Sequence, residues 1–131
     1  MLEVKNIEKS FGDKKVLDGV SLRVDQGDVV VILGPSGSGK TTFLRTLNYL
    51  EKADAGQLTL DGKNYDLAKI SRKEVLEIRQ KTAFVFQNYN LFANKTAIEN
   101  ILEGLVIARK IPKAEALEIA EKALAKVGLS D

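Results

Sequence analysis

Residues 29–41 have the sequence VVVILGPSGSGKT, in which the apolar run Val29 to Leu33 leads into a loop rich in glycine and serine. The loop, Gly34 to Thr41, fits the pattern G-x-x-x-x-G-K-[S/T] at every fixed position. A continuous apolar run of this length predicts a strand buried on both faces, as in a parallel sheet covered by helices. The segment Thr41 to Leu50 then carries apolar residues at helical spacing. This order of strand, loop and helix is typical of a phosphate-binding loop.

The residue types of this loop suit a bound anion. Glycines allow consecutive backbone N–H groups to turn inward around a phosphate with no side chain in the way. The helix that follows directs its positive N-terminal end toward the same place. We expect Lys40 to reach the β- and γ-phosphates of a nucleotide, and the Thr41 hydroxyl to bind Mg²⁺.

A surface turn rich in glycine and serine is the simpler alternative. Average residue frequencies give the pattern by chance in about one chain of this length in 200. The dinucleotide-binding pattern G-x-G-x-x-G is not matched, because Thr42 stands where its third glycine would be. With a strand predicted before the loop and a helix after it, the residues favour the phosphate loop.

Strand and helix signals alternate along the rest of the chain. Residues 1–24 have the alternating pattern of half-buried strands, and residues 55–66 return to it, with a hairpin predicted at Asp61-Gly62. Capping-box patterns that start at Ser71 and Thr96 predict the beginnings of two helices.

Two more elements complete this pattern. Residues 82–86 predict a second buried strand, which ends at Gln87. Pro112 is placed to open a last helix and Gly128 to stop it. The alternation of strands and helices predicts an α/β fold.

The composition excludes several kinds of site. The 131 residues contain no cysteine and no histidine, so disulfide frameworks, thiolate zinc sites and imidazole bases are excluded within this sequence. The formal net charge is +2, which gives no reason to expect nucleic acid as a partner. We find no segment with the pattern of a signal peptide or a membrane span.

Several stretches together carry a resemblance to a known family. They are Leu33 to Thr42, the segment Val85 to Phe92, Thr96 to Ile101, and Lys126 to Leu129. On these residues the chain resembles the ATP-binding subunit of ABC transporters, and among these the subunits that power bacterial uptake of polar amino acids. The resemblance implies a P-loop NTPase fold of the ABC type, with an N-terminal antiparallel β portion, part of a parallel core sheet and the start of a helical subdomain.

The resemblance also implies roles for single residues. Phe11 would stack on adenine and Val16 would pack beside the base. The residues that would hold the phosphates of ATP are Ser36, Gly37, Ser38, Gly39, Lys40, Thr41 and Thr42. Lys40 and Gln87 would have catalytic roles, and Thr41 and Gln87 would contact Mg²⁺, with Gln87 also near the attacking water. An ordinary place in or after a strand is the structural alternative for Phe11, Val16 and Gln87.

A partner surface is implied near Tyr89, Leu91 and Phe92, an apolar cluster in a turn-like stretch. The resemblance implies that a cytoplasmic helix of a transmembrane permease subunit docks there. The alternative is that these side chains fold back onto the helical subdomain. The complete protein would form a homodimer and lie peripherally on the cytoplasmic face of the cell membrane. Ala93-Asn94 follows Phe92 where the family often has Pro-His, a difference that concerns partner fit more than ATP chemistry.

The resemblance covers only the N-terminal half of the family's domain, because no LSGGQ, no apolar strand ending in Asp-Glu and no histidine occur here. We expect residues 1–87 to form a β-rich nucleotide-binding core with the phosphate loop at 34–41, and residues 88–131 to begin a truncated helical subdomain. The complete protein would hydrolyse ATP to power amino-acid import. We expect the 131-residue chain alone to bind Mg-nucleotide without turning it over, since the parts that complete the catalytic site are missing.

Two other hypotheses stay open. A small P-loop kinase requires an arginine-bearing lid, and Arg45, Arg72, Arg79 and Arg109 form no recognisable one. A non-catalytic nucleotide-binding module would bind ATP without turnover and would use the cluster at Tyr89 to Phe92 as its docking surface.

Overall fold

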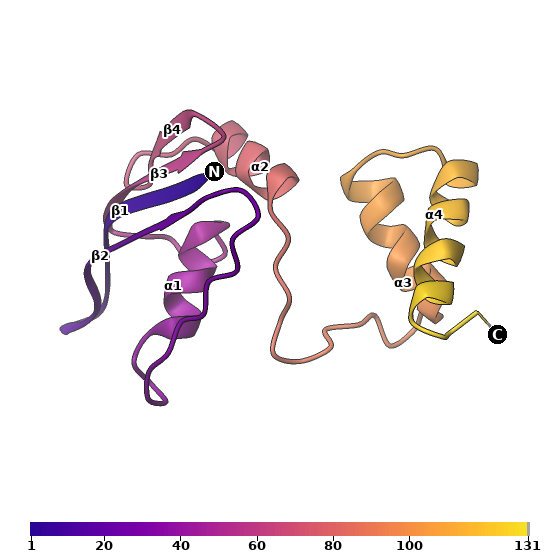
Figure 1. The fold of residues 1–131 in the computed structure, drawn as a ribbon, viewed down its shortest axis with the longest axis horizontal. Helices are drawn as coiled ribbons and strands as arrows, with labels where there is room; N and C mark the ends of the chain where they lie inside the picture. The colour runs from indigo at the N-terminus through magenta and orange to yellow at the C-terminus, as the bar shows by residue number, and fades with distance from the viewer. Residues whose placement is uncertain (131) are drawn as a thin grey trace. The chain divides into compact units, whose positions relative to one another are not determined.

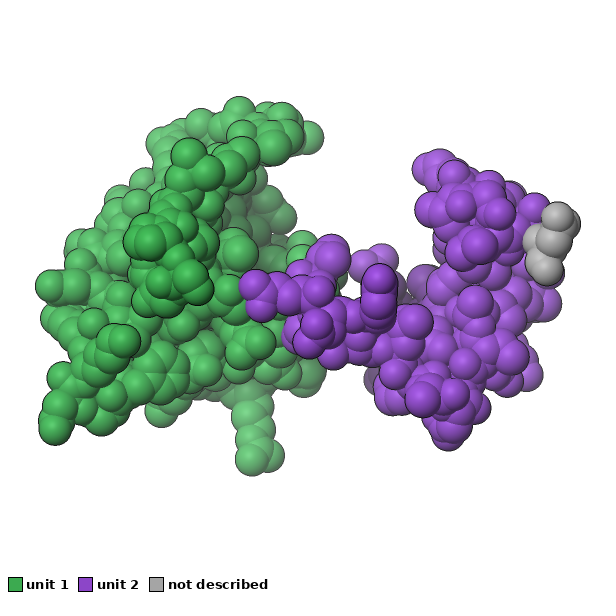
Figure 2. Space-filling view, turned by 90° about the horizontal axis from the view of Figure 1, so that it is seen from below, with its two compact units in different colours: residues 1–84 green, residues 85–131 purple. Residues whose placement is uncertain are grey.

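The chain forms two compact units, which are described separately. The structure, a computed structural model, describes residues 1–130. Its units are Met1–Phe84 and Val85–Asp131 (Figure 2), so the division falls slightly before the expected boundary after residue 87. None of the helices within residues 1–130 is long and apolar enough to cross a membrane.

The first unit is built on a four-stranded antiparallel sheet with the strand order β2-β1-β3-β4 (Figure 1). The strands are β1 (Leu2–Phe11), β2 (Lys14–Val24), β3 (Ala55–Leu60) and β4 (Lys63–Asp66). The predicted hairpin at Asp61-Gly62 is confirmed, because Leu60 pairs with Lys63 across it. Both turn residues have a positive φ, 50° at Asp61 and 82° at Gly62, which suits a two-residue turn between twisted strands.

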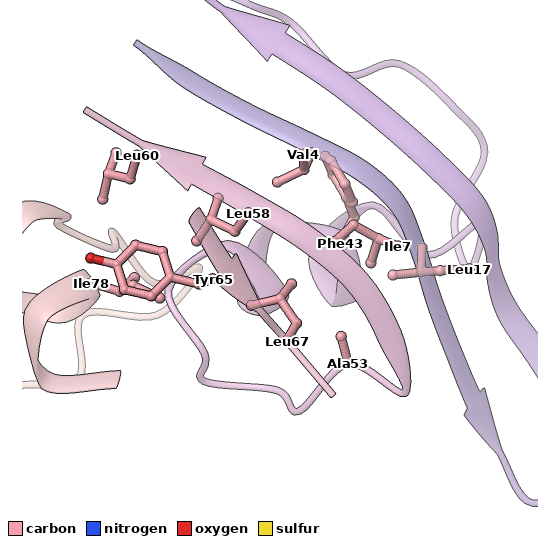
Figure 3. Packing of buried hydrophobic residues seen from close by; sticks show 10 residues of the cluster. All are labelled: Val4, Ile7, Leu17, Phe43, Ala53, Leu58, Leu60, Tyr65, Leu67 and Ile78. Atoms are coloured by element: carbon pink, nitrogen blue, oxygen red, sulfur yellow. The ribbon is translucent and has the colours of Figure 1, made fainter. Parts of the chain in front are cut away.

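Two helices pack against this sheet. Helix α1 (Lys40–Leu47) follows the glycine-rich loop, and helix α2 (Arg72–Lys81) begins at the predicted capping box, in which Ser71 and Glu74 bond each other's backbone N–H. One apolar core joins all four strands, both helices and the connecting segments (Figure 3). Its side chains are Val4, Ile7, Leu17, Phe43, Ala53, Leu58, Leu60, Tyr65, Leu67 and Ile78.

A bulge in β1 keeps the apolar residues of that strand in the core. Val4 pairs with Leu22 but Ile7 pairs with Val20, so β1 has one extra residue between the two pairs. Asn6, within the bulge, has a left-handed φ of 54°. Strict alternation would place Val4 and Ile7 on opposite faces, and the extra residue instead allows both to be buried.

Arg79 joins α2 to the end of α1. Its Nε donates to the carbonyl oxygen of Asn48 at 3.3 Å and its Nη2 donates to that of Tyr49 at 2.9 Å. Both carbonyls lie just beyond the C-terminus of α1. A guanidinium therefore lies at the negative end of this helix.

Lys63 and Tyr65 on β4 both contact Glu77 on α2. The Lys63 ammonium donates to the Glu77 carboxylate, and the Tyr65 hydroxyl donates to it at 3.3 Å. The hydrogen bond from Lys63 holds the pKa of Glu77 below its ordinary value and, reciprocally, raises the pKa of Lys63. Burial raises the pKa of the Tyr65 hydroxyl, which further favours the neutral form that donates to Glu77.

Residues 29–33 and 82–86 do not form strands, so the prediction of two buried strands is wrong for this structure. Val29 is 90% exposed, Leu33 87% and Val85 92%. A strand requires hydrogen bonds from a neighbouring strand, and within residues 1–130 no strand pairs with either segment. The described part of the chain consequently contains the antiparallel portion of the expected α/β fold but not its parallel sheet.

The second unit is helical. Helix α3 (Ala97–Leu102) begins at the predicted capping box of Thr96 and Glu99 and continues as a π-helix, η1 (Glu103–Ala108). Helix α4 (Lys113–Lys126) starts after Pro112, as predicted. Gly128 lies just past its end. The φ of Gly128 is 75° and its N–H donates to the carbonyl of Ala125, while Leu129 N–H donates to that of Leu124. This Schellman motif confirms the predicted stop.

Candidate nucleotide-binding site

The glycine-rich loop turns sharply into α1 at Gly37 and Gly39. Both have a positive φ, 77° and 94°, and Gly39 is the N-cap residue of the helix. A Cβ at Gly39 would lie 2.9 Å from Cγ1 of Val16 and 3.2 Å from the Val16 carbonyl oxygen. Glycine at position 39 therefore satisfies two requirements, the backbone angle and the close approach of β2.

Lys40 reaches back across the loop. Its Nζ donates to the carbonyl oxygens of Gly34 at 2.6 Å and Pro35 at 2.7 Å, and to Ser38 Oγ at 3.4 Å. All three acceptors are uncharged, so these contacts orient the ammonium without neutralising its charge. The loop thus holds the Lys40 ammonium beside its own backbone, where the charge is available to a bound anion.

The start of α1 offers further donors to the same anion. Gly39 provides no side-chain cap, and no acidic residue lies in the first turn. Backbone N–H groups at a helix start lack partners within the helix, so this end is left to an anion or to water. Ser36 and Ser38 are exposed, whereas Thr41 and Thr42 are partly buried at the first turn. The predicted phosphate-binding residues, 36–42, accordingly lie in the turn at 36–39 and in the first turn of α1 that follows it directly.

A bulge in β2 brings Val16 next to this loop. Ser10 pairs with Lys15 and Lys9 with Leu17, so Val16 is an extra residue without a cross-strand partner. Bulges of this kind redirect a side chain. Val16 is partly buried and lies against Gly39. A pocket of about 380 Å³ extends beneath the loop between α1 and β2, where Leu17, Ile32 and Phe43 are among the lining residues.

Phe11 lies at the end of β1, opposite Lys14 in the hairpin that leads to Val16. It is 48% exposed, and the Nζ of Lys9 lies 4.9 Å from the centroid of its ring. The sequence reasoning missed Lys9. The spacing of Lys9 and Phe11 could have indicated it, because residues two apart on a strand lie on the same face. A lysine two residues before an exposed aromatic residue is therefore placed to cover that ring.

The other predicted site residues belong to the second unit. Gln87 is exposed in a bend. Tyr89 is 93% exposed, Leu91 66% and Phe92 51%. Their exposure disagrees with the alternative that all three fold back onto the helical unit, and the predicted roles in catalysis and docking stay predictions.

Phe92 is the best anchored of these residues. The Oδ1 of Asn100 accepts its N–H at 2.8 Å, and Nδ2 of Asn100 donates to the carbonyls of Phe92, Lys95 and Thr96 at 3.3, 3.3 and 2.9 Å. The Lys95 Nζ lies 5.0 Å from the Phe92 ring centroid and also pairs with Glu103. Asn100 was not singled out from the sequence, because no local pattern shows that a helix residue will bind the loop before it.

Comparison with known proteins decides the family. A family model described as ABC transporter matches residues 17–131, which include the phosphate loop, helices α1 and α2, and the helices of the second unit. The chain belongs to the ABC transporter family. This membership favours an ABC-type ATP-binding subunit over a small P-loop kinase, as the sequence resemblance implied.

Curated relatives of this ABC transporter chain are ATP-binding proteins of amino-acid import or transport. It is 55% identical over 131 residues to the L-cystine import ATP-binding protein TcyN of Bacillus subtilis (strain 168), which covers 100% of this chain and 51% of that protein. It is 44% identical over 131 residues to the glutamine transport ATP-binding protein GlnQ of Escherichia coli (strain K12), covering 100% of this chain and 53% of that one. The chain thus spans about half the length of the curated relatives it matches.

Solved structures of the same family share the fold. The ATP-binding cassette MJ0796, in a dimeric post-hydrolysis state bound to ADP and Pi, matches with a TM-score of 0.80 and 31% identity, over 95% of this chain and 56% of that one. The cbiO1 protein of Clostridium perfringens, part of the transporter complex cbiONQ, matches with a TM-score of 0.78 and 28% identity, over 98% of this chain and 50% of that one. The expectation of an ABC-type P-loop fold is confirmed.

Proposed function

We propose that this chain binds Mg-ATP through residues 36–42, with Phe11 and Val16 beside the base. The observation that carries the proposal is the geometry of Lys40, whose charge is held across the loop by uncharged acceptors at the start of an uncapped helix. An ammonium, a helix N-terminus and glycine amides together suit a polyphosphate better than any neutral ligand.

The residues of this loop also fit Mg²⁺ delivered with the nucleotide. No group of three or more carboxylates capable of holding a metal occurs within residues 1–130, so a dedicated all-protein site is not formed there. Mg²⁺ usually combines one or two protein oxygens with phosphate oxygens and water. We propose the Thr41 hydroxyl as one such oxygen and the Gln87 side chain as a second contact. When bound, Mg²⁺ neutralises part of the phosphate charge.

Nucleotide binding is tested by titrating the chain with Mg-ATP and following the heat of binding. Lys40→Ala removes a charge-assisted contact worth about 1.5–3 kcal/mol, so affinity should fall roughly ten- to hundredfold. The matched control is Lys52→Ala, an exposed lysine of the same unit that should leave affinity unchanged. Equal affinity for Lys40→Ala and the unaltered chain would overturn the proposal.

The proposed role of the full-length protein is ATP hydrolysis that powers amino-acid import. The support is that the relatives named above are ATP-binding proteins of L-cystine import and of glutamine transport. We propose that the 131 residues alone bind nucleotide without hydrolysing it, since they contain no LSGGQ and no histidine. Phosphate release should thus be measurable for the full-length protein and absent for this chain. Turnover by this chain that disappears in Lys40→Ala would contradict that expectation.

The proposed partners are a second ATP-binding subunit and transmembrane permease subunits, with the protein peripheral on the cytoplasmic face of the membrane. Support for the homodimer comes from the dimeric state of MJ0796. We place the permease contact at Tyr89, Leu91 and Phe92, because these apolar side chains are exposed. Phe92→Ala in the full-length protein should reduce co-purification with the permease while leaving Mg-ATP affinity unchanged. Undiminished co-purification would argue against this location.

A further inference from the structure

Lys9 lies between the aromatic ring of Phe11 and two carboxylates. Its Nζ is 4.9 Å from the ring centroid, 3.2 Å from Glu51 Oε1 and 3.9 Å from Asp54 Oδ1. Only 12% of the Lys9 side chain is exposed. A lysine held this closely on three sides is not an ordinary solvated surface charge.

Asp54 also binds the backbone on both sides of Lys9. Ser10 N–H donates to Asp54 Oδ2 at 2.7 Å, and Asp54 N–H donates to the carbonyl oxygen of Glu8 at 2.8 Å. Glu51 lies in the turn that follows α1, where its N–H donates to the carbonyl of Arg45. Through these contacts Lys9 connects the end of β1, which carries Phe11, to the turn that follows α1.

We propose that Lys9 is a positioning residue for the purine base of the nucleotide. This inference rests on the proposed function, in which Phe11 stacks on that base. Lys9 covers one face of the Phe11 ring, and because Phe11 as a residue stays 48% exposed, a base can reach it to stack. A ring already held by a cation loses less conformational freedom on binding, so more of the stacking energy contributes to affinity.

The surroundings of Lys9 separate this role from phosphate binding. Glu51 and Asp54 together carry more negative charge than Lys9 carries positive charge, so this cluster offers no net attraction to a polyphosphate. The effect of Lys9 is accordingly confined to the base-dependent part of affinity. That part is measured by comparing ATP with tripolyphosphate, which has the phosphates and lacks the base.

The experiment titrates the 131-residue chain with Mg-ATP and, separately, with Mg-tripolyphosphate. Lys9→Met should weaken Mg-ATP binding about two- to fivefold and leave tripolyphosphate unchanged. Lys9→Arg keeps a cation over the ring and should restore the ratio of the two affinities. The matched control is Lys5→Met, on the same strand but with a side chain 62% exposed and paired with Glu3, which should change neither affinity.

A double-mutant cycle with Phe11→Ala shows whether Lys9 acts through the ring. Lys9→Met should have no further effect on Mg-ATP affinity in the Phe11→Ala background. The inference would be overturned if Lys9→Met weakened the binding of both ligands equally, or if it weakened Mg-ATP binding as much in the Phe11→Ala background as in the unaltered chain. Either result would leave the proposed function intact. If Phe11→Ala alone leaves the ratio of the ATP and tripolyphosphate affinities unchanged, the proposed stacking of a base on Phe11 and the inference both fail. If the unaltered chain binds neither ligand, the proposed function itself fails.

Discussion

Replacing Gly39 by alanine tests whether the phosphate loop is built as the structure shows. Alanine at a φ of 94° pays a conformational cost of about 1–2 kcal/mol. Its Cβ would also lie 2.9 Å from Val16 Cγ1 and 3.2 Å from the Val16 carbonyl oxygen, an overpacked contact that costs roughly 1–3 kcal/mol. The sum is roughly 2–5 kcal/mol, against roughly 4–13 kcal/mol for the stability expected of a unit the size of residues 1–84.

Gly37→Ala is the matched control within the same loop. Gly37 also has a positive φ, 77°, but a Cβ there would meet nothing within 4 Å. This substitution should therefore carry only the conformational cost of about 1–2 kcal/mol. The difference between the two variants isolates the contact with Val16. Adding Val16→Ala to Gly39→Ala should restore part of the loss, because it removes Cγ1 but leaves the carbonyl oxygen in place.

The assay is urea unfolding with linear extrapolation, combined with hydrogen exchange of the Ile7 and Leu58 amides, which report on the first unit. Gly39→Ala should lower the free energy of unfolding by about 1–3 kcal/mol more than Gly37→Ala does. Equal losses in the two variants, or no recovery with Val16→Ala, would refute the packing of β2 against the loop.

Three further outcomes are expected. The contact with Lys63 lowers the pKa of the Glu77 carboxyl in the folded state. The contribution of this contact to stability is therefore present above about pH 4.3 and is lost as pH falls through the lower folded pKa. In Glu77→Gln the urea midpoint should consequently fall less steeply between pH 7 and pH 3. Asn100→Ala removes the acceptor of the Phe92 N–H and should speed exchange of that amide about tenfold, seen by NMR, without changing exchange in residues 1–84. Val31→Lys should reduce self-association in sedimentation experiments, because Val31 is 72% exposed within an apolar run. Val127→Lys, at an exposed valine that lies outside that run, should not.

Local signals in the sequence predicted local structure well. The capping boxes at Ser71 and Thr96 and the stop at Gly128 depend on hydrogen bonds between residues three to five apart, so the information lies within a short window. The turn at Asp61-Gly62 depends on two backbone angles that these residues adopt readily.

The errors came from structure that depends on distant residues. The segment at 29–33 has the apolar composition of a buried strand, but composition cannot supply a neighbour, and its exposure reflects the absence of one in the described residues. The bulge at Val16 depends on register with β1 and was equally invisible, although it places that side chain against Gly39. The π-helix at Glu103–Ala108 has no sequence signal that we recognise.

The tie between Arg79 and the end of α1 makes the two ends of one short helix thermodynamically dependent on each other. An anion at the N-terminal turn and the guanidinium just beyond the C-terminus would both interact favourably with the dipole of α1. By reciprocity, an anion bound at the loop would strengthen the Arg79 hydrogen bonds, and a displacement of α2 that broke them would weaken the binding of that anion. If the loop binds nucleotide as proposed, substitution of Arg79 should therefore weaken that binding, although its hydrogen bonds lie at the other end of α1.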